Sequence, residues 1–230
     1  MFRFKRFTIN DDRCAMKVGT DGVLLGAWAD VDGAERVLDV GAGSGLVALM
    51  LAQRSEQVRV TAIEIDEEAA QQARENVAAS PFAGRVEVVA GDFLQYAAAP
   101  FDAVVSNPPF FEEDLLPPDQ QRASARHTSS GLNFESLVTG SCRLLREGGL
   151  LQVIVPKTAQ TRFHALCNAA GLTLARATDV RTVVRKAPKR VMLQFVKGAS
   201  AAAVVRDEIV LMENGERTAQ YAALCRDFYL

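Results

Sequence analysis

The residues with the clearest chemical potential lie in a short, stiff segment, Ser106-Asn107-Pro108-Pro109-Phe110. Each proline fixes its own φ angle, lacks an N–H and keeps the residue before it out of helical geometry. The Asn107 side-chain oxygen and the Pro108 carbonyl therefore form a rigid pair of hydrogen-bond acceptors. Such a pair suits a planar amino group, because the two acceptors can accept hydrogen bonds from both N–H groups and so redirect the lone pair of the nitrogen. Taken alone, the segment is also typical of an ordinary proline-rich loop.

A second segment, Asp-Val-Gly-Ala-Gly-Ser-Gly at 39–45, joins an apolar run to a helical pattern. Glycines let a backbone turn tightly and approach a ligand beside the positive end of a helix. Glu64 ends the next apolar run, where a carboxylate can accept hydrogen bonds from both ribose hydroxyls of a nucleoside. The G-x-G-x-G spacing differs from the G-x-G-x-x-G of dinucleotide dehydrogenases and argues against a nicotinamide oxidoreductase.

The elements that must position these residues alternate between β-branched runs and helical patterns, which predicts a mostly parallel sheet with helices on both faces. We expect strands at 36–40, 59–64, 85–90, 101–106 and 150–155, and helices at 46–54, 67–79, 134–146 and 159–170. Gly148-Gly149 is expected to end the third helix. Strands at 172–184 and 190–196, with no helix between them, predict an antiparallel hairpin at one edge of the sheet. A further strand at 208–212 and a closing helix at 218–229 complete the pattern.

We therefore expect an α/β fold with a seven-stranded sheet in one domain, residues 1–230. Residues 1–35 are expected to extend over the site, and residues 172–230 to form the edge hairpin and closing helix. The chain has 49% hydrophobic and 23% charged residues, which is typical of a folded domain. Its net charge is only −2, so a nucleic-acid partner would have to bind at a local basic patch.

Cysteines and histidines offer little for a metal site. The four cysteines are scattered without a CxxC pair, and His127 and His164 are isolated, so no protein-bound metal is expected. No apolar run approaches the roughly 18 residues of a membrane helix, and the N-terminus lacks the apolar region of a signal peptide. We expect a cytoplasmic protein that acts as a monomer without a membrane partner.

The glycine segment resembles the D-x-G-x-G-x-G loop of Rossmann-like class I S-adenosylmethionine-dependent methyltransferases. Asn107-Pro108-Pro109-Phe110 is similar to the [D/N/S]-P-P-[Y/F/W] signature of enzymes that methylate amino groups. The resemblance implies S-adenosylmethionine as cofactor, with Asp39 and Gly41 along its methionyl part and Glu64 on its ribose. Asp92 matches the acid that contacts the adenine amino group, although a turn aspartate explains it about as well. The implied cofactor-binding residues are Asp39, Gly41, Gly43, Gly45, Glu64, Asp92 and Asn107, and the implied catalytic residues are Asn107, Pro108 and Phe110.

A closer resemblance covers most of the chain. The segments Lys17–Trp28, Ala125-Arg126-His127 and Lys189–Leu193, together with the two motifs above, resemble bacterial tRNA1(Val) (adenine-37-N6)-methyltransferases. This implies methylation of the exocyclic N6 of adenine 37, beside the anticodon of valine tRNA. Phe110 stands where that family often has Tyr, and it keeps the surface on which a base would stack.

Other targets stay open. Asn-Pro-Pro-Phe also occurs in enzymes that methylate guanine amines in ribosomal RNA, and glutamine-modifying enzymes share Asn-Pro-Pro-Tyr. The alternative function is therefore methylation of a guanine N2 in rRNA or of a protein glutamine. A non-catalytic RNA-binding module is disfavoured, because the Asn107-Pro108 pair is intact.

A basic segment is expected to bind the tRNA. Five of the ten residues from Arg181 to Arg190 are basic, which indicates a surface for phosphates. An anticodon loop is already partly unstacked, so extracting its base costs less than in a duplex. The residues assigned to RNA are Arg126, His127, Arg185, Lys186, Lys189 and Arg190.

Overall fold

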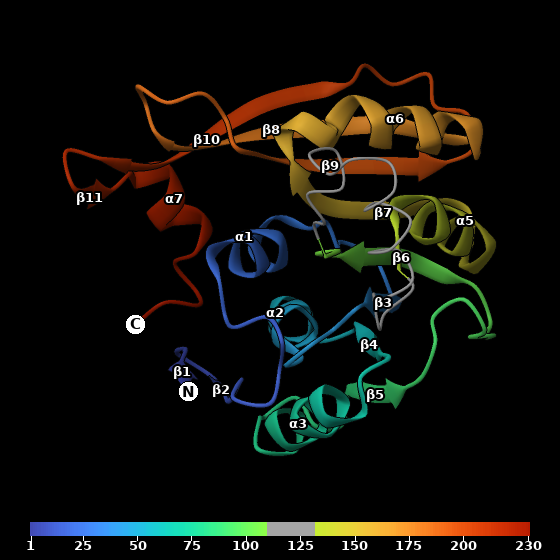
Figure 1. Cartoon of the computed structure of the whole chain (residues 1–230), viewed down its shortest axis with the longest axis vertical. Helices are drawn as coiled ribbons and strands as arrows, with labels where there is room; N and C mark the ends of the chain where they lie inside the picture. Colours follow the sequence, from blue (N-terminus) through green and yellow to red (C-terminus); the bar gives the residue numbers. More distant parts are fainter. Residues whose placement is uncertain (110–131) are drawn as a thin grey trace, which may run out of the picture.

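The computed structural model describes residues 1–109 and 132–230 (Figure 1). The first part contains β1 (Phe2–Arg3), β2 (Thr8–Ile9), α1 (Thr20–Trp28), β3 (Arg36–Val40), α2 (Leu46–Arg54), β4 (Arg59–Glu64), α3 (Glu67–Ala78), β5 (Val86–Ala90) and β6 (Phe101–Ser106). The second part contains α5 (Phe134–Leu144), β7 (Leu145–Pro156), η2 (Lys157–Ala159), α6 (Gln160–Ala169), β8 (Leu172–Val183), β9 (Arg190–Lys197), β10 (Val205–Glu213), β11 (Glu216–Arg217) and α7 (Ala219–Leu224). No helix in these two parts is long and apolar enough to cross a membrane.

One large sheet organises the chain. Its nine described strands lie in the order β11-β10-β8-β9-β7-β6-β3-β4-β5. The five adjacent strands β7, β6, β3, β4 and β5 are parallel to one another, and β9 is antiparallel to both β7 and β8. The predicted α/β fold with a mostly parallel sheet and an antiparallel hairpin is therefore confirmed.

Successive side chains of a strand point to opposite faces, so the sheet supports two separate hydrophobic cores. Ala103 and Val105 of β6 belong to the core that contains residues of α1, α2 and α7. Val104, between them, belongs to the core that contains residues of α5 and α6. Helices cover both faces, as expected, and the two chain ends lie side by side (Figure 1), where the Lys5 N–H donates to the Phe228 carbonyl at 2.9 Å.

The far side of the sheet differs from the prediction. The β8–β9 hairpin is not at the edge, because β10 pairs in parallel with β8 and β11 pairs with β10, which makes nine described strands in place of seven. The predicted strand at 208–212 is the central part of β10. The closing helix is shorter than expected: α7 spans Ala219–Leu224, and Cys225 caps it.

Gly148-Gly149 does not end a helix. α5 already ends at Leu144, and both glycines lie inside β7. Between the pairs Phe101–Leu145 and Ala103–Leu150 the register shifts, so β7 bulges at this point. Gly148 has a φ of 74°, and a Cβ on Gly149 would come within 2.9 Å of the Arg146 carbonyl. The glycines are required by the bulge, where two residues with side chains would not fit.

The contact between α1 and α2 yields a stability prediction. A Cβ on Gly26 would lie 2.8 Å from the Met50 Cβ, which the α2 backbone holds in place. A Cβ on Gly22, in the same helix, would meet only the mobile end of Leu46 at 3.1 Å. We expect Gly26→Ala to lower the free energy of unfolding by about 1–2 kcal/mol, because overpacking outweighs the gain in helix propensity. Gly22→Ala is the matched control and should be neutral or slightly stabilising. Urea unfolding measures both, and equal effects of the two substitutions would contradict the packing argument.

Candidate active site

A cavity of about 460 Å³ lies at the carboxyl edge of the parallel strands. Its walls come from segments that follow four neighbouring strands and from two segments outside the sheet. Open α/β sheets bind their ligands at this edge. The lining segments are Cys14–Met16, Val40 and Gly41, Gly43, Ile63–Asp66, Ala69, Gly91–Phe93, Asn107 with Pro109, and Leu132.

The glycine loop between β3 and α2 forms one wall. Gly41, Gly43 and Gly45 have φ angles of 71°, 52° and 80°, in the left-handed region that favours glycine. A Cβ on Gly43 would meet nothing within 4 Å, so the backbone there faces open space. Gly45 caps the N-terminus of α2, which leaves the first turn of that helix directed toward the loop. The loop is therefore shaped so that its backbone can approach a ligand closely.

Glu64 lies at the end of β4, as predicted, and lines the cavity. One oxygen of its carboxylate accepts the Gly43 N–H at 2.8 Å, and the other accepts the Asp66 N–H at 3.0 Å. Each carboxylate oxygen has a second lone pair, so Glu64 can hold the loop and still accept hydrogen bonds from a ligand. The position of Glu64 is therefore compatible with the predicted hydrogen bonds from its carboxylate to a ribose.

Asp39 is placed differently from the other residues of the cofactor prediction. It is 1% exposed and lies behind the glycine loop, outside the set of described residues that line the cavity. Its carboxylate accepts the Ala48 N–H at 3.0 Å and so holds the first turn of α2. Burial raises the pKa of Asp39 to about 7, although the Ala48 hydrogen bond opposes this shift, and the charge of Glu64 adds to it.

Asp92 follows β5 and lines the cavity, so its carboxylate can reach a bound ligand, as the predicted contact with the adenine amino group requires. It also organises its own turn: its carboxylate accepts the Leu94 N–H at 2.9 Å and the Gln95 amide at 3.2 Å. Both interpretations of this aspartate therefore fit its position. Phe93, beside it, is a lining residue that the motif analysis did not identify.

The Asn107-Pro108 segment leaves β6 at the cavity wall. The Ser106 hydroxyl donates to the Val40 carbonyl at 2.8 Å, which ties the end of β6 to the end of β3. Pro108 is buried, and Asn107 and Pro109 line the cavity. The Asn107 Oδ1 is buried and accepts no hydrogen bond from the part of the chain that the structure describes. Phe110 lies outside the described residues.

An unpaired buried oxygen costs free energy unless a ligand supplies its donor. The Asn107 Oδ1 therefore fits a cavity built for an amino group beside a nucleoside cofactor. The open space at Gly43 and Gly91 and the position of Glu64 fit that cofactor as well. Within residues 1–109 and 132–230, no cluster of three His, Cys, Asp or Glu side chains could hold a metal ion.

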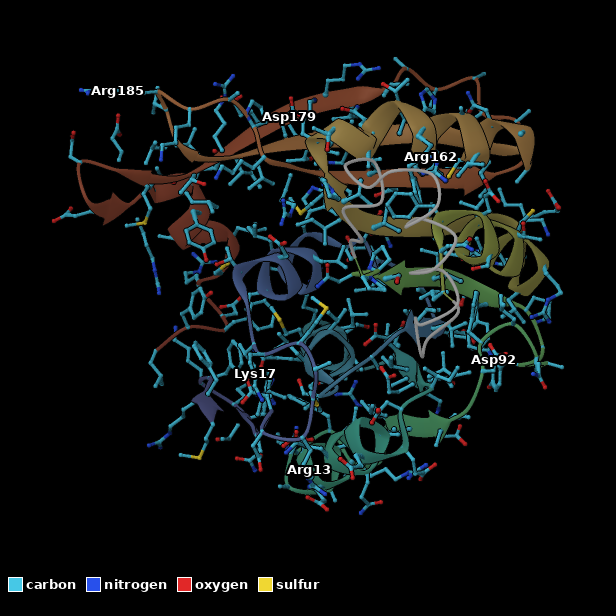
Figure 2. All side chains as sticks on the ribbon, in the orientation of Figure 1. Arg13, Lys17, Asp92, Arg162, Asp179 and Arg185 are labelled. Carbon is cyan, nitrogen blue, oxygen red and sulfur yellow. The ribbon has the colours of Figure 1, made fainter. Side chains whose placement is uncertain are left out.

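Four of the six predicted RNA-binding residues are described, and none of these four lines the cavity. Arg185, Lys186 and Lys189 are exposed on the connection between β8 and β9. Figure 2 shows Arg185 and Asp92 on opposite sides of the molecule. Arg190 has a structural contact, because its Nε donates to Asp21 of α1 at 2.8 Å. Arg126 and His127 lie outside the described residues.

Sequence reasoning missed the residues that bring the N-terminal segment to the site. Cys14, Ala15 and Met16 line the cavity, and two amides of α3, Gln72 and Asn76, contact this segment. Both amides are buried on a helix face that otherwise consists of alanine and valine. Two polar residues spaced i, i+4 on such a face are a signal that could have been recognised.

Solved structures define the class of protein. A predicted O-methyltransferase from Agrobacterium tumefaciens matches with a TM-score of 0.70 at 24% identity, over 90% of this chain and 96% of that chain. A putative RNA methyltransferase from Pyrococcus horikoshii matches with a TM-score of 0.55 at 18% identity, over 77% and 82%. The fold is that of the Rossmann-like class I methyltransferases.

The sequence comparisons are more specific. Residues 18–173 match the methyltransferase small domain family. The tRNA1(Val) (adenine(37)-N6)-methyltransferase of Bacteroides thetaiotaomicron is 45% identical over all of this chain and 97% of the relative, and that of Klebsiella pneumoniae subsp. pneumoniae is 44% identical over all of this chain and 94% of the relative. The chain belongs to the methyltransferase small domain family and, within it, to the family of these tRNA1(Val) methyltransferases, which confirms the resemblance inferred from its motifs.

Asp39 gives a prediction about pH. Between pH 4 and 7 the carboxyl is ionised in the unfolded chain and protonated in the folded one, so folding takes up a proton. Wild-type stability should therefore fall across this window relative to Asp39→Asn, by up to about 4 kcal/mol, and the difference should level off above pH 7. Urea unfolding of both proteins from pH 4 to 8, without cofactor, measures the difference. Parallel pH profiles would show that Asp39 keeps an ordinary pKa.

Proposed function

We propose that the protein transfers a methyl group from S-adenosylmethionine to the N6 amino group of adenine 37 in valine tRNA. The observation that carries the proposal is the buried Asn107 Oδ1 on the cavity wall, which accepts no hydrogen bond within residues 1–109 and 132–230. Full-length relatives at 43–45% identity, including that of Escherichia coli O157:H7, carry this activity in their names and support the same target.

The protein acts on the amino group mainly by position and electrostatics. S-adenosylmethionine supplies an electrophilic methyl group when it is bound. The Asn107 Oδ1 and the Pro108 carbonyl would accept hydrogen bonds from the two N–H groups of the adenine amine. These hydrogen bonds would turn the lone pair of the amino nitrogen toward the methyl group. Glu64 would accept hydrogen bonds from the ribose hydroxyls of the cofactor, and the glycine loop would hold its methionyl part. Phe110 supplies the surface on which the adenine stacks.

The tRNA backbone is held away from the reacting atoms. Exposed Arg185, Lys186 and Lys189 carry positive charge at the β8–β9 connection, and phosphate contacts there would fix the orientation of the tRNA. Arg190, Arg126 and His127 are the other residues that we assign to the RNA. Such contacts explain how a chain with a net charge of −2 binds a polyanion.

The protein would work as a cytoplasmic monomer with a single domain, where residues 1–35 cover the site and residues 172–230 extend the sheet. The β10 edge supports a monomer, because two of its outward carbonyls already accept hydrogen bonds. The Glu208 carbonyl accepts the Gln220 amide at 2.7 Å, and the Val210 carbonyl accepts the Thr218 hydroxyl at 2.5 Å. Pairing with a second copy along this edge would have to displace them.

Asn107→Ala should lower methyl transfer by at least about 100-fold, because one of the two acceptors is lost. Binding of S-adenosylhomocysteine, measured by calorimetry, should survive. Asn107→Asp is the matched control: it keeps an oxygen acceptor and should retain more activity than the alanine variant. Turnover by Asn107→Ala at the wild-type rate would remove Asn107 from the mechanism.

Nucleoside mass spectrometry after incubation with bulk tRNA and rRNA identifies the target. The proposal expects N6-methyladenine in tRNA. Methylguanine in rRNA, or methyl transfer to a protein glutamine without any modified nucleoside, would replace adenine 37 as the target.

Removing the basic residues of the β8–β9 connection should affect RNA binding alone. We expect the triple variant Arg185→Ala, Lys186→Ala, Lys189→Ala to raise KM for tRNA and to flatten its dependence on salt, because about three phosphate contacts are lost. Its Kd for S-adenosylhomocysteine should not change. Arg74→Ala is a single-charge control, since Arg74 is a half-buried arginine on α3 that pairs with Glu67. An unchanged KM and salt slope in the triple variant would exclude this surface.

A further inference from the structure

We propose that Gln72 and Asn76 of α3 are positioning residues that hold residues 10–18, here called the strap, across the cofactor cavity and thereby set how tightly the cofactor is retained. The inference rests on the proposed function, since it assumes that S-adenosylmethionine binds in this cavity. The strap matters because Cys14, Ala15 and Met16, at its centre, line the cavity.

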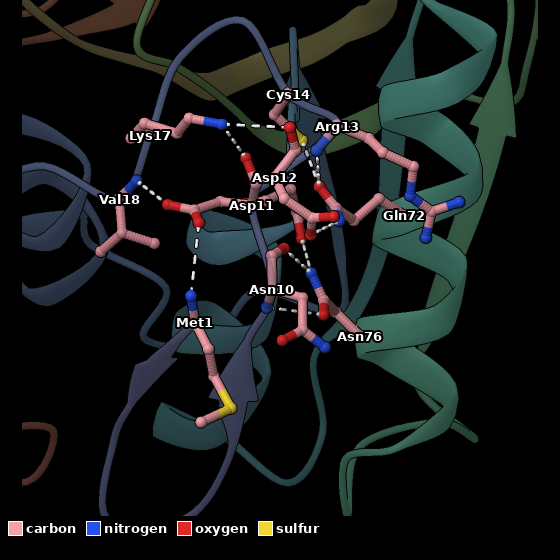
Figure 3. Close-up of polar contacts among 11 residues, drawn as sticks. Met1, Asn10, Asp11, Asp12, Arg13, Cys14, Lys17, Val18, Gln72 and Asn76 are labelled. Atoms are coloured by element: carbon pink, nitrogen blue, oxygen red, sulfur yellow. Dashed lines mark hydrogen bonds and ion pairs between the residues drawn. The ribbon is translucent and has the colours of Figure 1, made fainter.

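The strap is first closed on itself (Figure 3). The Asp11 carboxylate accepts the Val18 N–H at 2.8 Å, which joins its two ends. The Lys17 amine donates to the Asp11 carbonyl at 2.6 Å and to the Asp12 carbonyl at 3.2 Å. These contacts form a turn that carries residues 14–16 at its tip, so the turn moves as a unit.

Gln72 holds this turn against α3. Its Oε1 accepts the Arg13 N–H at 3.0 Å and the Cys14 thiol at 3.2 Å, and its Nε2 donates to the Asp12 carboxylate at 2.6 Å. The side chain is 1% exposed in a helix whose neighbouring buried residues are alanines. One amide therefore satisfies three consecutive residues of the strap (Figure 3).

Asn76, one helical turn further on, joins the strap to the glycine loop. Its Oδ1 accepts the Asn10 N–H at 2.9 Å, and its Nδ2 donates to the Asn10 carbonyl at 2.7 Å. The same Nδ2 donates to the Ser44 carbonyl of the glycine loop at 2.9 Å. A single side chain, 2% exposed, thus fixes the beginning of the strap relative to the glycine loop, which forms another part of the cavity wall.

The ion pair that the strap also makes with α3 is weaker than the contacts of these two amides. Arg13 also pairs with Glu75, but both side chains are well exposed, and such surface pairs contribute little. Met16 is 50% exposed and lines the cavity, so a bound ligand would cover part of its side chain. Retention of the cofactor therefore depends on the Gln72 and Asn76 contacts and on Met16 covering the bound ligand.

The test compares Gln72→Ala with Gln71→Ala, an exposed neighbour on α3 that contacts Glu75 and not the strap. We expect Gln72→Ala to raise the Kd for S-adenosylhomocysteine about tenfold, which is about 1.4 kcal/mol, and to raise KM for S-adenosylmethionine with kcat little changed. Gln71→Ala should leave both values within about twofold of wild type.

A second measurement follows the strap itself. Trypsin can cut after Arg13 and Lys17, and mass spectrometry identifies the N-terminal fragments that end there. S-adenosylhomocysteine should slow the release of these fragments from the wild type and from Gln71→Ala, but not from Gln72→Ala. Because the readout is specific to these two bonds, it separates opening of the strap from global unfolding.

Met16→Ala supplies a variant that leaves the α3 contacts intact. It should weaken S-adenosylhomocysteine binding, and the double variant with Gln72→Ala should be little weaker than Gln72→Ala alone, since both act through one strap. Equal Kd values for wild type and Gln72→Ala, or fully additive effects in the double variant, would overturn the inference and leave the proposed function standing. A wild-type protein that does not bind S-adenosylhomocysteine would overturn both.

Discussion

The site depends on one set of backbone contacts, in which the glycine loop folds back onto the end of β4. The Ile63 carbonyl accepts the Gly41 and Ala42 N–H groups at 3.0 and 3.1 Å, and the Glu64 carboxylate accepts the next N–H, that of Gly43. Three successive donors are thus fixed to the end of the neighbouring strand. Only a chain with left-handed glycines can follow this path. The pairing of β3 with β4 therefore positions the loop, the first turn of α2 and Glu64 together.

The parts of the structure that follow from short stretches of chain could be predicted from the sequence. The predicted strands at 36–40, 59–64 and 101–106 coincide with β3, β4 and β6, because each is a short run rich in apolar residues that ends before a turn or a helix-capping residue. The sequence also predicts Asn107 and Glu64 at the carboxyl edge of the sheet, because each lies at the end of one of these runs. Five of the seven predicted cofactor residues line the cavity, namely Gly41, Gly43, Glu64, Asp92 and Asn107.

The parts that depend on contacts between distant residues could not be predicted. Gly148-Gly149 has the composition of a helix stop, and only the pairing of β7 with β6 shows that the glycines serve a bulge. Asp39 carries the motif of a ligand-binding residue, yet burial behind the loop gives it a partner in α2. Arg190 belongs to a basic run, but α1 brings Asp21 beside it from 169 residues away. In each case a partner distant in the sequence provides a contact that the local pattern could not indicate.

The two kinds of wall around the cavity differ in how firmly they are held. The sheet edge is fixed by strand pairing and by a hydrophobic core on each face, so opening it would require global unfolding. The strap is held mainly by side-chain amides, and such contacts break at a lower cost. An amide is the group that this task requires, since Gln72 must accept the Arg13 N–H and donate to the Asp12 carboxylate at once. A carboxylate at this position would repel Asp12, and an ammonium group could not accept from Arg13. The buried glutamine is therefore explained by the strap and not by the packing of α3, where an apolar side chain would be as stable.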